Sequence, residues 1–366
     1  MEYEKPLFFR VMSYASDADH DVIDMVSGNP DWEPPSALRD ALHEYADFSP
    51  DRFQYAPSEG IHELRNEIAN RRQVDPDSII ITNGAGEANY LAMASALDRA
   101  AGTEVVLTDP VYPYYPGKTT MLGGEARYVP VAEDGTLTLD AVAEAVGSQT
   151  ACIVVNTPNN PTGAVYDEET MRGLIDLATD HDAILVSDEV YDHFDHSGHF
   201  TSALSIDSPH RIVTNSFSKS LAITGFRVGY GVFPTELIDR ARTRHMLVNV
   251  TGSRPAQYAV YRTLRETAPD YFAANRRTIQ RRIETFTESL ADTDAQYLRP
   301  VGSFYVMVRF PGLPGTLENV FRLIDEAGVA GMPGEVFGQA RAAWFRFALV
   351  TPRVDEAATR LERYFR

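Results

Sequence analysis

Short apolar runs rich in β-branched residues recur along the first two thirds of the chain and alternate with segments of helical periodicity. Five of these runs lack polar alternation, namely 78–82, 104–108, 151–155, 183–187 and 211–214. Strands that are buried on both faces have this character. The pattern therefore predicts an α/β fold whose main element is a mainly parallel sheet with helices on both sides.

The C-terminal part of the chain follows a different pattern. Residues 270–292 carry apolar side chains at helical spacing among many charges, which predicts one long amphipathic helix. Shorter apolar runs at 304–308 and 344–348 flank a helix predicted near 317–327. We expect a large domain and a smaller α+β domain formed from the two chain ends. The predicted segments are an N-terminal arm with the first part of the small domain (1–44), the large domain (45–270), and the connecting helix with the C-terminal small domain (271–366).

The composition is strongly acidic. Asp and Glu number 52 against 33 Lys and Arg, for a formal net charge of −19, and only three of the basic residues are lysines. Such a surface repels nucleic acids and anionic membranes, so we predict neither as a partner. Dense carboxylates with few lysines resemble salt-adapted, haloarchaeal cytosolic proteins; an ordinary acidic cytosolic enzyme is the alternative.

The chain carries no basic leader followed by an apolar stretch, and no apolar run approaches the roughly 18 residues of a membrane span. We therefore expect a soluble, cytoplasmic protein. Its one cysteine, Cys152, lies in an apolar run and is expected to be a core residue. We expect no metal site.

The most distinctive residue is Lys219, which follows the run at 211–214 in the segment Asn215-Ser216-Phe217-Ser218-Lys219. A lysine at the carboxyl end of a buried strand is unlike a solvated surface group, and a buried amine condenses with aldehydes and later acts as a base. Ser216, Ser218 and Arg227 are candidate donors to a phosphate. A stray lysine in a turn is the alternative interpretation.

Two further strand ends carry polar groups of matching chemistry. Asp188 can keep a pyridine nitrogen protonated, and Tyr191, three residues later, can donate to a phenolate oxygen. Asn160 stands between prolines in the segment 156–163, whose rigid backbone can aim one amide at the same oxygen. Each segment alone also fits a plain structural role, as an Asp-Glu cap or an Asn-Pro turn.

Gly84, Ala85 and Gly86 follow the first run and open a predicted helix. Bare N–H groups at a helix N-terminus form an anion site that suits a phosphate. The segment is neither a G-x-G-x-x-G fingerprint nor a Walker A loop, so nucleotide binding has little support. Three tyrosines stand in segment 109–115, and one of them can stack on a planar ring, with a packed aromatic turn as the alternative.

Together these segments resemble the class I/II aminotransferases of the fold type I pyridoxal-phosphate family, of the aspartate aminotransferase kind. The resemblance implies pyridoxal 5'-phosphate as cofactor and transamination between an α-amino acid and a 2-oxo acid through a Lys219 Schiff base. It also implies a homodimer with shared active sites. The matching segments, in the family's order, are 27–31, 55–60, 64–65, 84–87, 109–115, 160–163, 188–191, 216–229, 333–338 and 345–347.

The resemblance also implies a role for each matching residue. Around the cofactor ring it makes Lys219 the catalytic lysine, Asp188 the partner of the pyridine nitrogen, Asn160 and Tyr191 the phenolate donors, and Tyr112 the stacking aromatic. The implied phosphate ligands are Gly84, Ala85, Gly86, Ser216, Ser218 and Arg227, with Tyr55 reaching across from the second subunit. For the substrate, it makes Arg346 the residue that binds the α-carboxylate, with Gly28 and Asn160 nearby.

Substrate preference stays open between acidic, aromatic and aliphatic amino acids. Val248 stands where the dicarboxylate-specific subgroup carries an arginine, which weakens a strict aspartate assignment. Arg254 is either a substitute for that arginine or a surface or interface residue, and Arg10 either lines the substrate entrance or belongs to a packing arm. The extra arginine of histidinol-phosphate enzymes is missing from 328–332.

Two other functions remain as alternatives at this point. A β-lyase or an amino-acid decarboxylase would use the same scaffold, because the reaction depends on which substrate bond stands perpendicular to the ring. A non-catalytic, pyridoxal-phosphate-binding regulatory protein is disfavoured by the acidic charge and by the lack of a helix-turn-helix pattern before Ser27.

Overall fold

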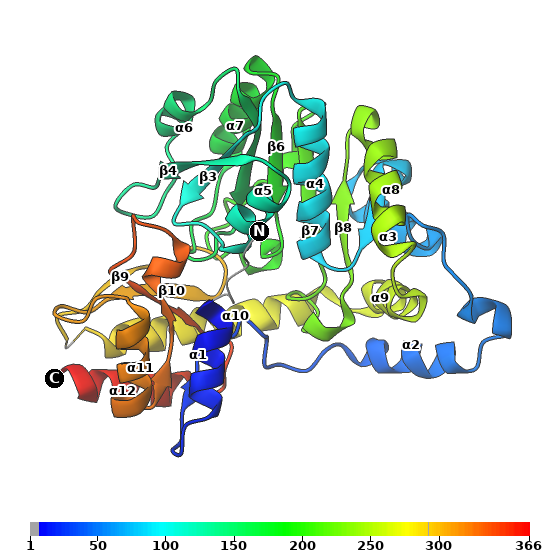
Figure 1. The fold of residues 1–366 in the computed structure, drawn as a ribbon. Coiled ribbons are helices and arrows are strands. Elements are labelled where there is room, and N and C mark those ends of the chain that lie inside the picture. The colour runs from blue at the N-terminus through cyan, green and yellow to red at the C-terminus, as the bar shows by residue number, and fades with distance from the viewer. Residues whose placement is uncertain (1–6, 292) are drawn as a thin grey trace.

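A computed structural model describes residues 7–291 and 293–366, so Lys5 and the expected helix end at Asp292 lie outside the described residues. The main sheet has seven strands (Figure 1). β8 runs antiparallel to both neighbours, and the other strand pairs are parallel, which confirms the predicted sheet. In spatial order the strands are β2 (Ile79–Thr82), β8 (Gly229–Val232), β7 (Arg211–Ser216), β6 (Ile184–Asp188), β5 (Thr150–Asn156), β3 (Glu104–Asp109) and β4 (Glu125–Pro130).

Two of these strands were not predicted from the apolar runs. β4 is an edge strand, and only one of its six residues is buried, so it lacks a continuous apolar run. β8 has the sequence Gly-Tyr-Gly-Val, and its two glycines weaken the strand signal. Both strands are recognised only by the neighbours with which they pair.

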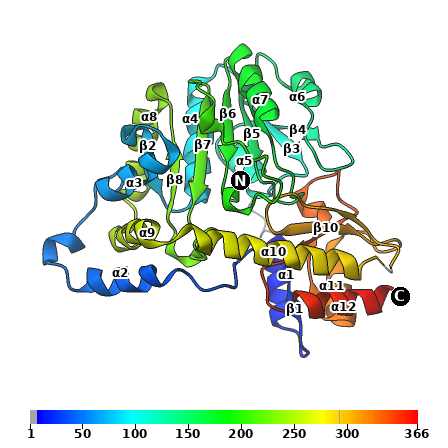
Figure 2. The same ribbon diagram turned by 180° about the vertical axis from the view of Figure 1, so that it is seen from behind.

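Helices cover both faces of the main sheet (Figure 2). On one face, Val105 and Leu107 pack in a cluster with Leu91 and with the free, buried Cys152. On the other face, Val106 packs with residues from a second layer of helices. Each large apolar side chain that leaves water in this way contributes about 1.5–3 kcal/mol. The helices of the first face are α4 (Ala85–Arg99) and α8 (Thr235–Asn249), and those of the second are α3 (His62–Arg72), α6 (Leu139–Ala145), α7 (Glu168–Asp180) and α9 (Arg254–Glu266).

A second lobe contains a four-stranded antiparallel sheet with strands β12 (Met332–Pro333), β13 (Phe345–Ala348), β10 (Tyr305–Arg309) and β9 (Gln296–Leu298). The two chain ends meet here, because β1 (Ile23–Asp24) pairs in parallel with β11 (Val329–Ala330). One apolar cluster joins the sheet to α1 (Leu7–Ser16), α11 (Leu317–Ala327) and α12 (Val354–Phe365).

The predicted long helix is present as α10 (Pro269–Ser289) and runs beneath the main sheet toward the second lobe in both ribbon views. α2 (Ser36–Ala46) packs against α9, and α5 (Tyr114–Met121) follows β3. Short 3-10 turns lie at Pro50–Phe53, Pro76–Ser78, Asp192–Phe194, Ala203–Ser205, Thr224–Phe226 and Gly334–Phe337. The division of the chain into an N-terminal arm with the first part of the small domain (1–44), a large domain (45–270) and a connecting helix with the C-terminal small domain (271–366) stays a prediction. None of the described helices has the length and apolarity needed to cross a membrane.

The strands that precede the candidate residues all end at one edge of the main sheet. β2 points the same way as the parallel strands, because β8 separates it from β7 and is antiparallel to both. The second lobe contacts this edge, where the backbone N–H of Val111 donates to the carbonyl of Phe337 at 2.7 Å. Loops from both lobes therefore surround the carboxyl ends of the strands, where ligands bind in folds of this type.

Candidate active site

Lys219 lies at the centre of these loops and is half-buried. Its Nζ donates a 2.7 Å hydrogen bond to the carbonyl oxygen of Gly28, which comes from the N-terminal segment. Burial, aided by the positive charges of Arg346 and Arg227, lowers the pKa of Lys219 to about 8. At neutral pH roughly a tenth of the amine is then unprotonated, far more than for an exposed lysine. The predicted nucleophile is thus half-buried, lies in the field of two arginines, and is partly uncharged.

Asp188, at the end of β6, is buried, and its carboxylate accepts hydrogen bonds from residues that are distant in the sequence. Its Oδ2 accepts hydrogen bonds from the Tyr115 hydroxyl at 2.6 Å and from Asn89 Nδ2 at 2.7 Å. Thr214 in turn donates to Asn89 Oδ1 at 2.6 Å. Burial raises the pKa of Asp188, and the bonds from Tyr115 and Asn89 oppose that shift by favouring the charged form.

Tyr115 and Asn89 are site residues that the sequence analysis missed. Tyr115 belongs to the tyrosine-rich segment after β3, but nothing in that segment distinguishes it from Tyr112 or Tyr114. Its ring lies 5.5 Å from that of Tyr112 in an edge contact. Asn89 lies about one turn after Gly86 on α4, and its side chain is buried. A polar residue on the inner face of that helix is the sequence feature by which it could have been recognised as a site residue.

Arg346 on β13 is buried and lies between two aromatic rings. Its guanidinium carbon is 4.4 Å from the ring centre of Tyr305 and 5.1 Å from that of Phe337. Nη1 donates to Asn160 Oδ1 at 3.1 Å and Nη2 to the Val26 carbonyl at 2.6 Å. Its Nε has no hydrogen-bond partner among the described residues. An unpaired, buried guanidinium nitrogen is a ready site for a carboxylate.

Tyr191 and Asn160 meet in the same place. Asn160 Nδ2 lies 3.5 Å from the Tyr191 hydroxyl, and that hydroxyl is 3.1 Å from the hydroxyl of Tyr305. A Cβ at Gly28 would lie 2.2 Å from the Tyr305 hydroxyl and 3.5 Å from Lys219 Nζ. Tyr305 is therefore a further site residue that the sequence analysis missed: it contacts Tyr191 and Arg346 and, like Lys219, lies beside Gly28.

The loop between β2 and α4 has the geometry of an anion site. Gly84 is the N-cap of α4 and has a φ of 81°, a conformation that favours glycine. A Cβ at this position would approach Arg227 Nη2 to 2.6 Å, so the guanidinium lies directly against the glycine. Arg227 is held there by bonds from Nη1 to the Thr224 carbonyl and from Nη2 to the Asn83 carbonyl, at 2.9 and 3.0 Å. The helix dipole and a permanent cation thus act on the same space.

Other residues complete or support this loop. Ser216 and Ser218 are buried at the end of β7 and just beyond it. Glu87, in the first turn of α4, accepts from the Asn83 backbone N–H and from His245 Nδ1, both at 2.6 Å. The sequence analysis assigned no role to Glu87, and its contacts show that it fixes the entry to the helix.

Four residues considered from the sequence lie away from this site. Tyr55 is 81% exposed and Val248 is 58% exposed. Arg254 Nη1 donates to the carbonyls of Asp51 and Gln54 at 3.0 and 3.3 Å, so it braces the turn before Tyr55. Arg10 is exposed on α1. In the part of the chain that the structure describes, no group of three or more His, Cys, Asp or Glu residues is placed to hold a metal.

Comparison with known proteins gives a consistent result. The family model described as aminotransferase class I and II matches residues 20–361. A probable aspartate/prephenate aminotransferase of Thermus aquaticus is 32% identical over 338 residues, which are 88% of this chain and 87% of that protein. Aromatic-amino-acid aminotransferase 2 of Thermococcus litoralis is 30% identical over 361 residues, 93% of this chain and 91% of that protein. The solved structure of Thermus thermophilus aspartate aminotransferase with maleate has a TM-score of 0.92 at 30% identity and covers 98% of this chain and 97% of that chain.

A half-buried lysine, a buried carboxylate and an anion site at the sheet edge agree with what a pyridoxal-phosphate enzyme requires. The chain belongs to the aminotransferase class I and II family and is a pyridoxal-phosphate-dependent aminotransferase. Its α/β fold with a larger and a smaller lobe agrees with the solved relatives. The relatives are aminotransferases, which supports transamination over the β-lyase, decarboxylase and regulatory alternatives.

Proposed function

We propose that Lys219 is the residue to which the cofactor is attached and that its amine afterwards carries the proton during transamination. The observation that carries this assignment is the position of Lys219 Nζ, which donates to the Gly28 carbonyl within the field of Arg346 and Arg227. The lowered pKa does not single out Lys219, because burial lowers the pKa of Lys118 to about 8 as well. The other described lysine, Lys118, is half-buried in α5 and lies 5.5 Å from the ring centre of Tyr114.

The residues present fit pyridoxal phosphate. When bound, this cofactor supplies an aldehyde that condenses with amines and a ring that accepts electrons from the substrate's α-carbon. Asp188 is proposed to face the ring nitrogen, because a buried carboxylate held by Tyr115 and Asn89 stabilises a protonated pyridine. Asn160 and Tyr191 are proposed to donate to the phenolate oxygen.

The remaining cofactor contacts follow from the anion site and the aromatic segment. Tyr112 is proposed to stack on the ring. The loop at Gly84, the α4 dipole and Arg227 supply a positive field in this part of the site, which supports their assignment to the phosphate. The proposed phosphate ligands are Gly84, Ala85, Gly86, Ser216, Ser218 and Arg227, together with Tyr55 of the partner subunit.

The substrate is an α-amino acid in one half-reaction and a 2-oxo acid in the other. Arg346 binds the α-carboxylate through its unpartnered Nε, while Asn160 and the Val26 carbonyl keep the guanidinium in place. Lys219 Nζ then removes the proton from the α-carbon. Loops from both lobes surround these groups, and exclusion of water there would strengthen each charge interaction.

Two properties of the whole protein belong to the same proposal. We propose a homodimer, since Phe53, Tyr55, Leu247 and Val248 present apolar side chains that are more than half exposed. The protein is proposed to be cytoplasmic and salt-adapted, on the basis of 52 acidic residues and only three lysines. Sedimentation or light scattering at low and high salt measures both the oligomeric state and its salt dependence.

The decisive test compares Lys219→Ala with Lys118→Ala as a matched control. Wild type and the Lys118 variant should bind pyridoxal phosphate with the absorbance of a lysine-linked cofactor, and amino acids should convert that absorbance. The Lys219 variant should show neither the absorbance of a lysine-linked cofactor nor its conversion by amino acids.

A panel of acidic, aromatic and aliphatic amino acids, each paired with 2-oxoglutarate, identifies the preferred side chain. Release of ammonia or CO2 without amino-group transfer would contradict the proposed reaction.

A further inference from the structure

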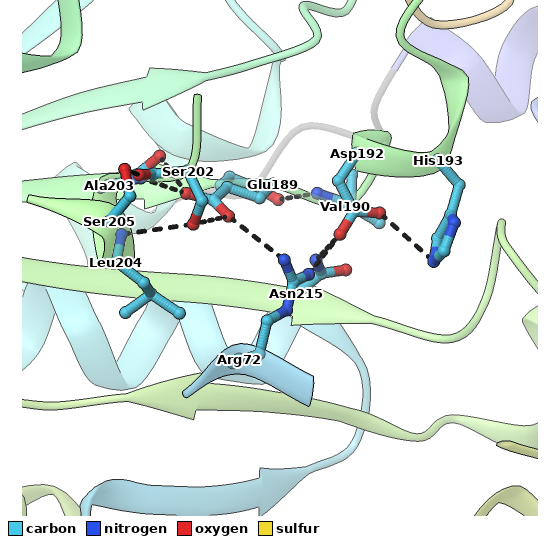
Figure 3. A network of polar contacts seen from close by, with 12 residues as sticks. Arg72, Glu189, Val190, Asp192, His193, Ser202, Ala203, Leu204, Ser205 and Asn215 are labelled. Carbon is cyan, nitrogen blue, oxygen red and sulfur yellow. Dashed lines mark hydrogen bonds and ion pairs between the residues drawn. The ribbon is translucent and has the colours of Figure 1, made fainter. Parts of the chain in front are cut away.

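A second cluster of charges lies on the turn that follows Asp188, and Figure 3 shows its polar contacts. Glu189 is fully buried, and the side chain of Asp192 is 9% exposed. Glu189 Oε2 accepts from Ser202 Oγ at 2.7 Å and Oε1 from the Ala203 N–H at 2.9 Å. Glu189 and Asp192 stand three residues apart on one turn, so their carboxylates repel each other when both are charged. Burial raises the free-energy cost of that repulsion unless a cation lies nearby.

Arg72, the last residue of α3, supplies that cation. Its Nη2 donates to Asp192 Oδ2, its Nε donates to the Tyr230 hydroxyl at 2.8 Å, and its Nη1 lies 4.0 Å from Glu189 Oε2. All three nitrogens therefore point at partners on other elements. A planar guanidinium can make these contacts at once, whereas a lysine has only one nitrogen.

The same cluster reaches the strand that leads to the lysine. Asp192 Oδ2 also accepts from Asn215 Nδ2 at 3.0 Å, and Asn215 Oδ1 accepts from the Ser216 N–H at 2.6 Å. Tyr230, which receives the Arg72 bond, pairs with Asn215 across β7 and β8. Arg72 thus joins the turn carrying Asp188 and Tyr191 to the strand end carrying Ser216 and Lys219.

We propose that Arg72 is a positioning residue of the active site: it fixes the turn of Asp188 and Tyr191 relative to the strand end of Ser216 and Lys219. It touches neither substrate nor cofactor and acts through Asp192, Glu189 and Asn215. This inference rests on the proposed roles of Asp188 and Lys219. Without Arg72, Asp192 loses its ion pair, the turn relaxes, and the site loses a nearby positive charge.

The test measures cofactor affinity and the pH midpoint of the cofactor's absorbance in Arg72→Met, with Arg71→Met as matched control. Arg71 precedes Arg72 on the same helix, pairs with Glu67 and donates to the Leu264 carbonyl, and makes no hydrogen bond or ion pair to the turn among the described residues. Arg72→Met should raise the apparent dissociation constant for pyridoxal phosphate roughly tenfold, as loss of a partner that orients a ligand does in metal sites. It should also raise the pH midpoint by about half a unit, because loss of a cation stabilises the protonated form. Arg71→Met should change neither.

Two further variants and the wild type complete the design. Arg72→Met combined with Asp192→Asn removes the carboxylate that Arg72 pairs with and should restore part of the pH midpoint. If Arg72→Met does not fold, Arg72→Lys decides, because it keeps the charge and loses the fork: weaker cofactor binding with a nearly unchanged midpoint is expected. The proposal is overturned if the folded Arg72 variant binds the cofactor as wild type does and shares its midpoint. Absence of lysine-linked absorbance in wild type would instead contradict the proposed role of Lys219.

Discussion

Tyr115 donates a 2.6 Å hydrogen bond to Asp188, although the two residues stand 73 positions apart in the chain. Asn89 donates to the same carboxylate oxygen, so Oδ2 is fully engaged. Oδ1 accepts only the Val190 N–H, at 3.2 Å, among the described residues. The carboxylate therefore keeps one oxygen for a further donor, which is what a partner of a protonated ring nitrogen requires.

Replacement of Tyr115 by Phe should impair turnover. A buried carboxylate that loses one charged hydrogen bond is destabilised by about 1.5–3 kcal/mol, so kcat should fall roughly ten- to a hundredfold. The pKa of Asp188 should rise further, so the acid limb of the kcat profile should move to higher pH. Tyr114→Phe is the control, since Tyr114 is partly exposed and makes no such bond among the described residues. A normal acid limb in Tyr115→Phe would contradict the assigned role of that bond.

Arg346→Lys should affect both half-reactions. Lysine keeps the charge but loses the planar fork held by Asn160 and Val26, so KM for the amino acid and for the 2-oxo acid should each rise roughly a hundredfold. Steady-state kinetics with both substrates checks this. Arg353→Lys, on an exposed arginine paired with Asp21, should leave both constants unchanged. An increase for only one substrate would show that Arg346 does not bind the shared carboxylate.

Gly84→Ala should weaken cofactor binding. The new Cβ meets Arg227 Nη2 at 2.6 Å and sits on a backbone with a φ of 81°, so the arginine or the loop must move. We expect the dissociation constant for pyridoxal phosphate to rise about tenfold, since strain of this kind costs about 1–3 kcal/mol. Gly147→Ala is the control, because a Cβ there meets no atom within 4 Å and Gly147 is not a residue of the proposed phosphate site. Equal affinities for the two variants, measured by fluorescence quenching, would contradict the proposed phosphate loop.

Glu189→Gln should change the pH dependence of stability. Burial raises the pKa of Glu189 to about 7, with Arg72 and Ser202 opposing the shift. Between its unfolded value near 4.5 and this folded value, the native state holds more protons than the unfolded state, so stability falls as pH rises through that window. The Glu189 variant should lose less stability than wild type between pH 5 and pH 8. The measurement is the melting temperature of both proteins at several pH values between 5 and 8. The same change of melting temperature with pH in both would show that Glu189 does not titrate as described.

The sequence revealed the strand ends but not the contacts across the fold. Lys219 and Asp188 were recognisable because each follows an apolar run, and parallel strands bring their carboxyl ends together. Tyr305 was missed because its bond to Tyr191 spans 114 positions, and Arg72 because its bond to Asp192 spans 120. On a single strand or helix, each of these looks like an ordinary core aromatic or surface charge. Their partners follow only from tertiary packing.

The central claim is that Lys219 is the site of cofactor attachment. Borohydride reduction of the enzyme with bound pyridoxal phosphate, followed by peptide mass mapping, tests it most directly. We predict that the added pyridoxyl mass is found on the peptide containing Lys219 and on no other lysine. Label on the Lys118 peptide instead, or on no peptide at all, would contradict the assignment and with it the proposed active site.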